Sequence, residues 1–192
     1  MRWNCLASIL FVLAVSAAPR GARAQWKTPW DYEGPRGPAH WAALDPAYAA
    51  CNGREQSPID IRATTKADLP ALQFEYRSGP LEGLTDNGKT IRVNYHAPRT
   101  DNFLVVGADR YRLTQFHFHR PAEELVNGKR YDMVLHLMHE SSAGRVVGVA
   151  VLLTAGKPNG TVQRLWDHMP KVVGTEDSVP GVDIDPADML PR

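Results

Sequence analysis

Residues 115–140 read QFHFHRPAEELVNGKRYDMVLHLMHE and hold four of the seven histidines of the chain. In the first run, His117 and His119 alternate with phenylalanines, and residues two apart on a β-strand point to the same face of a sheet. The turn-forming dipeptide Asn127-Gly128 connects this run to a second alternating one. The stretch therefore predicts two neighbouring strands that gather histidines on one face.

The second run contributes His136 and His139, which have opposite parity on a strand, so only one of them can face the first pair. A hairpin sets His136 across from His117 and His119. Three histidine nitrogens with an open fourth position form a catalytic zinc site. We therefore predict that these three residues bind Zn²⁺, with Gln115 holding the second nitrogen of one ligand imidazole.

Two other interpretations of the histidines remain open. A His-x-His pair taken alone is often structural. The spacing of His117, His119 and Glu123 also matches the core of a cupin motif, in which the glutamate is a fourth ligand. We rank a cupin-type metalloprotein as a remote alternative, since Gly128 is too close for the motif's glycine and His168 lacks a Pro-x-Gly lead-in.

The first 24 residues differ in kind from the rest of the chain. An apolar run over residues 6–18 follows a positively charged start, and a small-x-small cleavage site ends at Ala24. This pattern predicts a signal peptide over residues 1–24, with residues 25–192 as an exported domain in the periplasm or outside the cell. The apolar run is short for a bilayer span, so we expect no membrane association after cleavage.

Charge and cysteine content narrow the possible partners. The chain has 22 Lys and Arg against 21 Asp and Glu, and its first 24 residues carry three arginines and no acid. The mature chain then has a formal charge of about −2 and no basic run, so we expect no nucleic-acid partner. Its remaining cysteine, Cys51, indicates an intermolecular bond, a free thiol or a missing partner, and the oligomeric state stays unknown.

Strand signals recur at short intervals from residue 72 onward, separated by turn residues. The expected strands cover residues 72–76, 90–95, 103–106, 111–119, 133–139 and 146–153. We predict one helix over 161–169, a further helical piece over 38–48, and no strand over 178–192. The expected fold class is a mostly β domain with few short helices and a large central, mainly antiparallel sheet.

These residues resemble the α-class carbonic anhydrases, particularly the exported bacterial kind, over nearly all of residues 28–192. The matching blocks are Trp30-Asp31-Tyr32, Gly37-Pro38-Ala39-His40-Trp41, Gln56-Ser57-Pro58-Ile59-Asp60-Ile61, Asp86-Asn87-Gly88, residues 115–123 and Leu135-His136-Leu137-Met138-His139. The resemblance implies reversible hydration of carbon dioxide to bicarbonate and a proton by zinc-bound hydroxide. Zn²⁺ is the implied cofactor, and CO2 or bicarbonate is the implied small-molecule substrate.

The resemblance also implies roles by position. It makes His117, His119 and His136 the zinc ligands, with Gln115 as a partner of the ligand set. Glu123 takes the place of a buried glutamate that, in the family, accepts a hydrogen bond from a gatekeeping threonine. The residues implied around the site and its CO2 pocket are Asn87, Tyr32, Met138 and Val151.

Two positions depart from the family pattern. Lys89 stands at the position of the proton-shuttle histidine, and lysine ordinarily titrates near pH ~10, so we expect a solvated residue that shuttles protons poorly. Val134 stands where the family has a glutamate that orients the third ligand. Losses of this kind commonly cost ~10–100-fold in metal affinity or activity.

The family pattern also continues beyond Arg192, into a Thr-Thr-Pro-Pro stretch that carries the gatekeeping threonine. In bacterial relatives a cysteine beside that stretch pairs with the counterpart of Cys51. We therefore expect a domain that is incomplete at its C-terminus. Three hypotheses follow: a zinc carbonic anhydrase, a catalytically impaired zinc-binding or scaffold protein of the same family, and a fragment whose exposed sheet edges promote aggregation.

Overall fold

The computed structural model describes residues 3–4, 11–15, 29–95 and 101–191. The described residues form two compact units, one over residues 29–59 and one that combines the strands before residue 18 with the chain from residue 60 onward. The predicted signal-peptide cleavage site after Ala24 lies outside the described residues. No helix within the described ranges is long and apolar enough to cross a membrane.

The unit over residues 29–59 consists of short helical turns around a cluster of aromatic rings. Its elements are η1 (Gly34–Arg36), η2 (Pro38–His40), α1 (Trp41–Leu44) and η3 (Pro46–Asn52). The ring centroid of Trp30 lies 5.3 Å from those of Tyr32 and Trp41, so Tyr32 packs within this unit. The exposed Cys51 is also here, and it forms no disulfide with another described residue. The helical piece predicted over residues 38–48 is confirmed.

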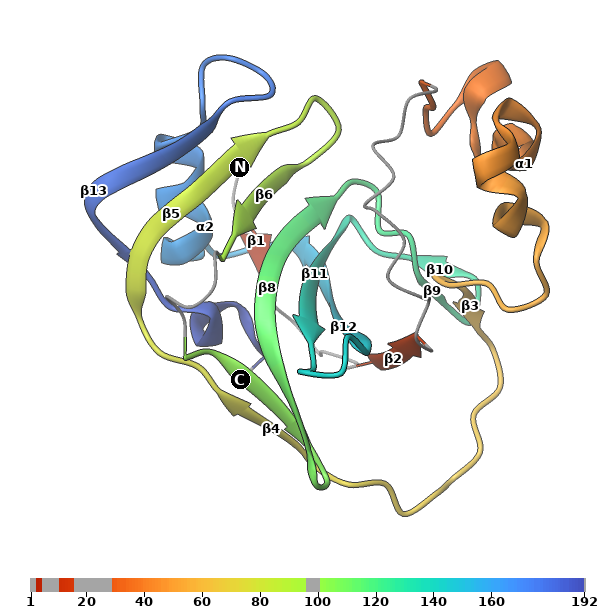
Figure 1. Ribbon diagram of the computed structural model, residues 1–192, viewed down its shortest axis with the longest axis horizontal. Coiled ribbons are helices and arrows are strands. Elements are labelled where there is room, and N and C mark those ends of the chain that lie inside the picture. The colour runs from red at the N-terminus through yellow and green to blue at the C-terminus, as the bar shows by residue number, and fades with distance from the viewer. Residues whose placement is uncertain (1–2, 5–10, 16–28, 96–100, 192) are drawn as a thin grey trace. The chain divides into compact units, whose positions relative to one another are not determined.

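The other unit is a large curled sheet, antiparallel throughout (Figure 1). Its strands are β1 (Trp3–Asn4), β2 (Phe11–Val15), β4 (Leu72–Glu75), β5 (Gly79–Asp86), β6 (Ile91–Asn94), β7 (Phe103–Val106), β8 (Asp109–His119), β11 (Met133–Glu140), β12 (Val146–Ala155) and β13 (Glu176–Ile184). Their main order in space is β1-β12-β11-β8-β6-β5-β13; β2 also pairs with β12, and β7 pairs with β4 and β8. A small second sheet joins β3 (Asp60–Ile61), β9 (Leu125–Val126) and β10 (Lys129–Arg130).

Strand β8 organises the large sheet. The first part of this strand pairs with β7 and the last part with β6, while β11 runs along its other side. In the β8–β11 ladder, His136 is paired with His117, and Val134 is paired with His119. This register sets the histidines of the two strands across from one another, as predicted, although the Asn127-Gly128 turn joins β9 to β10 and does not connect β8 directly to β11.

The two faces of the sheet differ in what they pack against. One face carries the main core, in which Phe116, Phe118, Leu135 and Leu137 of the central strands join Leu165 of α2 (Gly160–Asp167). The short η4 (Pro186–Met189) adds Met189 to the same core. The opposite face carries the histidines and a smaller apolar cluster, whose buried members are Ala122, Val134, Ala150 and Leu152.

The mostly β fold class is confirmed, with the six predicted strands and the predicted helix all present. Further strands were missed, and β5 and β13 are the longest of them. One of them, β13, crosses the region 178–192 in which we predicted no strand, so that prediction is wrong. Most side chains of β13 are exposed, and its pairing with β5 shifts register around Val179, so no regular apolar alternation marks the strand in the sequence.

Candidate metal centre

Three histidines come together on one face of the two central strands. One ring nitrogen each of His117 and His119, from β8, and of His136, from β11, lies within 4.8 Å of the others. The ring centroids are 4.7 Å apart for the pair on β8, and 5.3 and 5.0 Å from His136. Within the described part of the chain, this is the one group of His, Cys, Asp or Glu side chains suited to hold a metal ion.

His139, the fourth histidine of the stretch, lies on the opposite face of β11. Its side chain is fully buried, with Nε2 2.6 Å from the hydroxyl oxygen of Tyr76 and Nδ1 3.3 Å from the backbone oxygen of Val147. Burial lowers the pKa of His139 to about 4. Because both ring nitrogens already have partners, this histidine has no nitrogen left for a metal ion.

The second nitrogens of two histidines in the group are held by side-chain oxygens. Oε1 of Gln115 lies 2.8 Å from Nδ1 of His117, and Oε1 of Glu124 lies 2.7 Å from Nε2 of His136. When a neutral imidazole donates the N–H of one nitrogen, its lone pair is on the other. The nitrogens left for a metal are therefore Nε2 of His117 and Nδ1 of His136.

Glu123 lies beside the same group. Its Oε2 is 3.5 Å from Nε2 of His119 and 3.9 Å from Nδ1 of His136, so these two nitrogens point toward a common region. The pKa of His119 is lowered to about 4, first by burial and then by the charge of His136. The His119 ring is therefore neutral near pH 7, and its contact with Glu123 is not an ion pair at that pH.

Burial and repulsion keep His117 neutral as well. Its pKa is lowered to about 3, with burial as the largest cause, followed by the positive charges of His119, His136 and Arg92. Neutral imidazole is the form that binds a metal ion. Near neutral pH, these two histidines therefore do not have to lose a proton before they bind a metal ion.

Two charged residues adjoin the histidines without having been singled out from the sequence. Arg92 of β6 is paired with His117 in the ladder, and its Nε has no hydrogen-bond partner among the described residues. Glu124 is only 2% exposed and bonds His136. No sequence signal marks Arg92, whereas the adjacent carboxylates at 123 and 124 are a feature that could have drawn attention to Glu124.

Of the two residues implied for a CO2 pocket on β11 and β12, the structure brings one to the histidine face. Met138 shares the parity of His136 on β11. Val151, by contrast, is paired with Leu135 and is fully buried in the main core on the other face. The expectation that Val151 lines a CO2 pocket beside the histidines is therefore wrong. Ala150 is the β12 residue opposite His136. Residues 146–153 are apolar on both faces, which is why their parity could not be read from the sequence.

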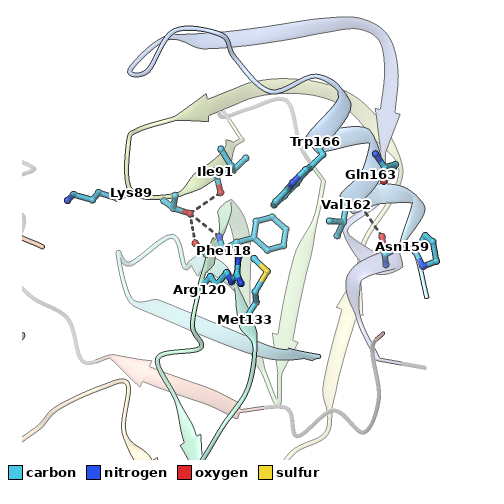
Figure 2. Close-up of a pocket in the computed structure, with 11 residues that line it drawn as sticks. Lys89, Ile91, Phe118, Arg120, Met133, Asn159, Val162, Gln163 and Trp166 are labelled. Atoms are coloured by element: carbon cyan, nitrogen blue, oxygen red, sulfur yellow. Dashed lines mark hydrogen bonds between the residues drawn. The ribbon is translucent and has the colours of Figure 1, made fainter. Parts of the chain in front are cut away.

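Asn87 and Lys89 belong to the turn between β5 and β6. Oδ1 of Asn87 accepts hydrogen bonds from the backbone N–H groups of Lys89 and Thr90, so Asn87 shapes the turn. Lys89 borders a cavity of about 420 Å³, and its amino group extends away from the other lining residues (Figure 2). Phe118 and Trp166 meet edge to face at this cavity, which places it on the phenylalanine side of β8.

Comparisons with known proteins agree with this geometry. The model of the eukaryotic-type carbonic anhydrase family matches residues 36–192. A carbonic anhydrase of Nostoc sp. is 38% identical over 168 residues, which are 84% of this chain and 62% of that protein. One from Klebsiella pneumoniae is 42% identical over 143 residues, which are 74% of this chain and 57% of that protein.

Solved structures show the same likeness. The α-carbonic anhydrase of Thermovibrio ammonificans, solved with the inhibitor sulfanilamide, superposes with a TM-score of 0.74 at 35% identity. The match covers 85% of this chain and 72% of that one. The chain spans about three fifths of the length of the carbonic anhydrases from Nostoc sp. and Klebsiella pneumoniae.

Proposed function

The chain belongs to the eukaryotic-type, or α-class, carbonic anhydrase family, and we propose that it binds Zn²⁺ and catalyses the reversible hydration of CO2 to bicarbonate. The observation that carries this proposal is the group of three histidine nitrogens within 4.8 Å of one another. The cupin alternative is set aside, because the chain belongs to another family.

The residues present fit a zinc ion. His117, His119 and His136 supply three imidazoles, and three histidines with an open position are a known catalytic zinc ligand set. The lowered pKa values of the two ligands on β8 favour the neutral, metal-binding form. Gln115 and Glu124 fix the tautomers of two ligands, as partners of metal-bound histidines commonly do.

A zinc ion in this site would acidify a bound water molecule and so provide a nucleophile near neutral pH, an effect for which carbonic anhydrase itself is the standard example. The chain's own residues prepare the surroundings. Glu123 places a carboxylate beside His119 and His136, so it would add a negative charge next to an ion held by these histidines. Met138 adds a partly exposed apolar side chain on the histidine face, which suits a substrate with no net dipole.

A catalytically impaired zinc-binding protein is the second candidate function. It is favoured by Lys89, which occupies the turn where the family has a proton-shuttle histidine, because a lysine is a poor proton shuttle near neutral pH. In that case zinc binds but proton transfer, and with it CO2 hydration, is slow.

One experiment tests both candidates. The expressed chain is loaded with zinc, its metal content is measured, and CO2 hydration is followed by stopped flow with a pH indicator. We expect activity above the buffer rate that sulfanilamide inhibits and that His117→Ala abolishes. Bound zinc without activity would support the impaired protein, and failure to bind zinc would contradict both candidates.

We further propose that residues 1–24 are a signal peptide and that the protein is exported. The apolar run and the Ala22-Arg23-Ala24 site support this. Two backbone stretches of this segment, β1 and β2, pair with β12 in the full chain. N-terminal sequencing of the protein recovered from a secreting host should begin at Gln25. Recovery of the intact N-terminus from the cytoplasm would contradict export.

A further inference from the structure

Val134 stands on the histidine face at the position where the family has a glutamate. In the family pattern, the carboxylate of that glutamate orients the third zinc ligand. Val134 is fully buried and is paired with His119 on one side and Leu152 on the other, so the position is filled by packed apolar side chain. From the sequence we expected His136 to lack an acidic partner. The structure shows otherwise, because Glu124 reaches the same imidazole from the segment that follows β8.

The contact between Glu124 and His136 is short and nearly closed to solvent. Oε1 of Glu124 lies 2.7 Å from Nε2 of His136, and the side chains are 2% and 13% exposed. The second carboxylate oxygen, Oε2, has no hydrogen-bond partner among the described residues. Burying a carboxylate is costly unless its charge is compensated, so this residue is a poor choice if its only purpose is to stabilise the fold.

The direction of this hydrogen bond has a consequence for the metal site. Nε2–H of His136 donates to Glu124, so the lone pair of the ring is on Nδ1, which lies 3.9 Å from the same Glu123 oxygen that Nε2 of His119 approaches. A carboxylate behind a metal-bound imidazole fixes its tautomer and raises its basicity. On β8, His117 has only the neutral amide of Gln115 in the corresponding place.

We propose that Glu124 is the positioning residue for His136 and supplies, from outside the β11 strand, the carboxylate that Val134 lacks. This inference rests on the proposed zinc site. The zinc affinity that the absence of a glutamate at position 134 would cost is then retained, because the acidic partner of His136 comes from another segment of the chain.

The test compares zinc affinity and metal-free stability in matched variants. Zinc dissociation constants are measured by competition with a chelator, and stability by urea unfolding of the metal-free protein. We expect zinc affinity to fall ~10-fold in Glu124→Gln, which keeps an acceptor but loses the charge, and up to ~100-fold in Glu124→Leu. Glu140→Gln, the same change on an exposed residue at the end of β11, should leave affinity unchanged.

Two outcomes separate positioning from a structural role. We expect the metal-free Glu124→Leu variant to be at least as stable as the wild type, because it no longer buries a carboxylate, although it binds zinc least well. Adding Val134→Glu to Glu124→Gln should recover affinity by returning a carboxylate to the same face.

If Glu124→Gln and Glu124→Leu bind zinc within ~2-fold of a zinc-binding wild type, Glu124 does not position the ligand. If stability and affinity fall together and Val134→Glu recovers neither, the role is structural. A wild type that binds no zinc would instead refute the proposed function.

Discussion

Strand β11 places two histidines, three residues apart, in opposite chemical environments. His136 is on the face with the other two histidines, where Glu124 holds Nε2 and leaves Nδ1 toward the group. His139 is on the core face, where Tyr76 and Val147 occupy both ring nitrogens. Burial raises the pKa of Tyr76, so its hydroxyl stays protonated and can donate to Nε2 of His139.

The difference shows that hydrogen-bond partners decide which histidine can bind a metal ion. On the histidine face, one side-chain oxygen holds one nitrogen of His117, and a different one holds one nitrogen of His136. The second nitrogen of each ring is left available for a metal ion. On the core face, complete pairing makes His139 a packing residue. Substitutions on the histidine face should therefore mainly lower zinc affinity, and substitutions on the core face should mainly lower the stability of the protein.

The largest expected effect comes from deleting a ligand. His119→Ala should weaken zinc binding by more than the ~10–100-fold typical of losing a ligand's partner. His139→Ala should leave zinc affinity unchanged in the folded protein while lowering its stability. Metal analysis after dialysis against a weak chelator measures both. Equal loss of zinc from the two variants would remove the distinction between the faces.

Acid should destabilise the metal-free protein through both faces. His117, His119 and His139 have pKa values of about 3, 4 and 4 in the folded state. The unfolded chain, with histidine pKa values near ~6.5, therefore takes up protons first as the pH falls. The free energy of unfolding should decrease from pH ~6.5 down to ~4, by at most ~1.4 kcal/mol per pH unit for each histidine.

Urea unfolding at several pH values checks this prediction. His139→Phe removes one of the three groups and should make the dependence on pH shallower. An identical pH dependence in the variant would show that His139 titrates normally in the folded protein.

Gln115 offers a smaller effect on the histidine face. Gln115→Leu removes the oxygen that holds Nδ1 of His117, so zinc affinity should fall ~10-fold. The neighbouring Thr114→Val, whose hydroxyl bonds the backbone oxygen of Met138, provides a matched control with no contact to a ligand nitrogen. Chelator competition measures both. A larger loss of affinity in the control than in Gln115→Leu would contradict this role.

Tyr76→Phe makes the corresponding change on the core face. It removes the hydroxyl partner of the buried His139 and should cost ~1–3 kcal/mol of stability, because a buried acceptor is left unpaired. Zinc affinity should not change. A measurable change in zinc affinity with unaltered stability would mean that the two faces are coupled.

The smallest effect is expected at Lys89. Lys89→Met should leave zinc affinity unchanged and alter CO2 hydration by less than ~2-fold, since a lysine at this position is a poor proton shuttle. Lys89→His should instead raise the rate at low buffer concentration. Stopped-flow assays at two buffer concentrations check this, and a marked loss of activity in Lys89→Met would show that the lysine carries protons.

The histidine face was predictable from the sequence because alternation on strands determines which side chains share a face. His117, His119 and His136 form a group, and His139 lies apart, as parity requires. The same rule could not place Val151, since β12 is apolar on both faces. Glu124 was missed because its segment connects strands and has no periodicity from which a direction could be inferred.

X-ray absorption at the zinc edge of the zinc-loaded chain tests most directly whether the three-histidine group is a metal centre. We predict one zinc ion per chain with three imidazole nitrogens at ~2.0–2.1 Å and one further oxygen. His136→Ala should lose the bound zinc. A chain that holds no zinc at equilibrium, or a zinc ion that His136→Ala retains with unchanged ligands, would contradict the account.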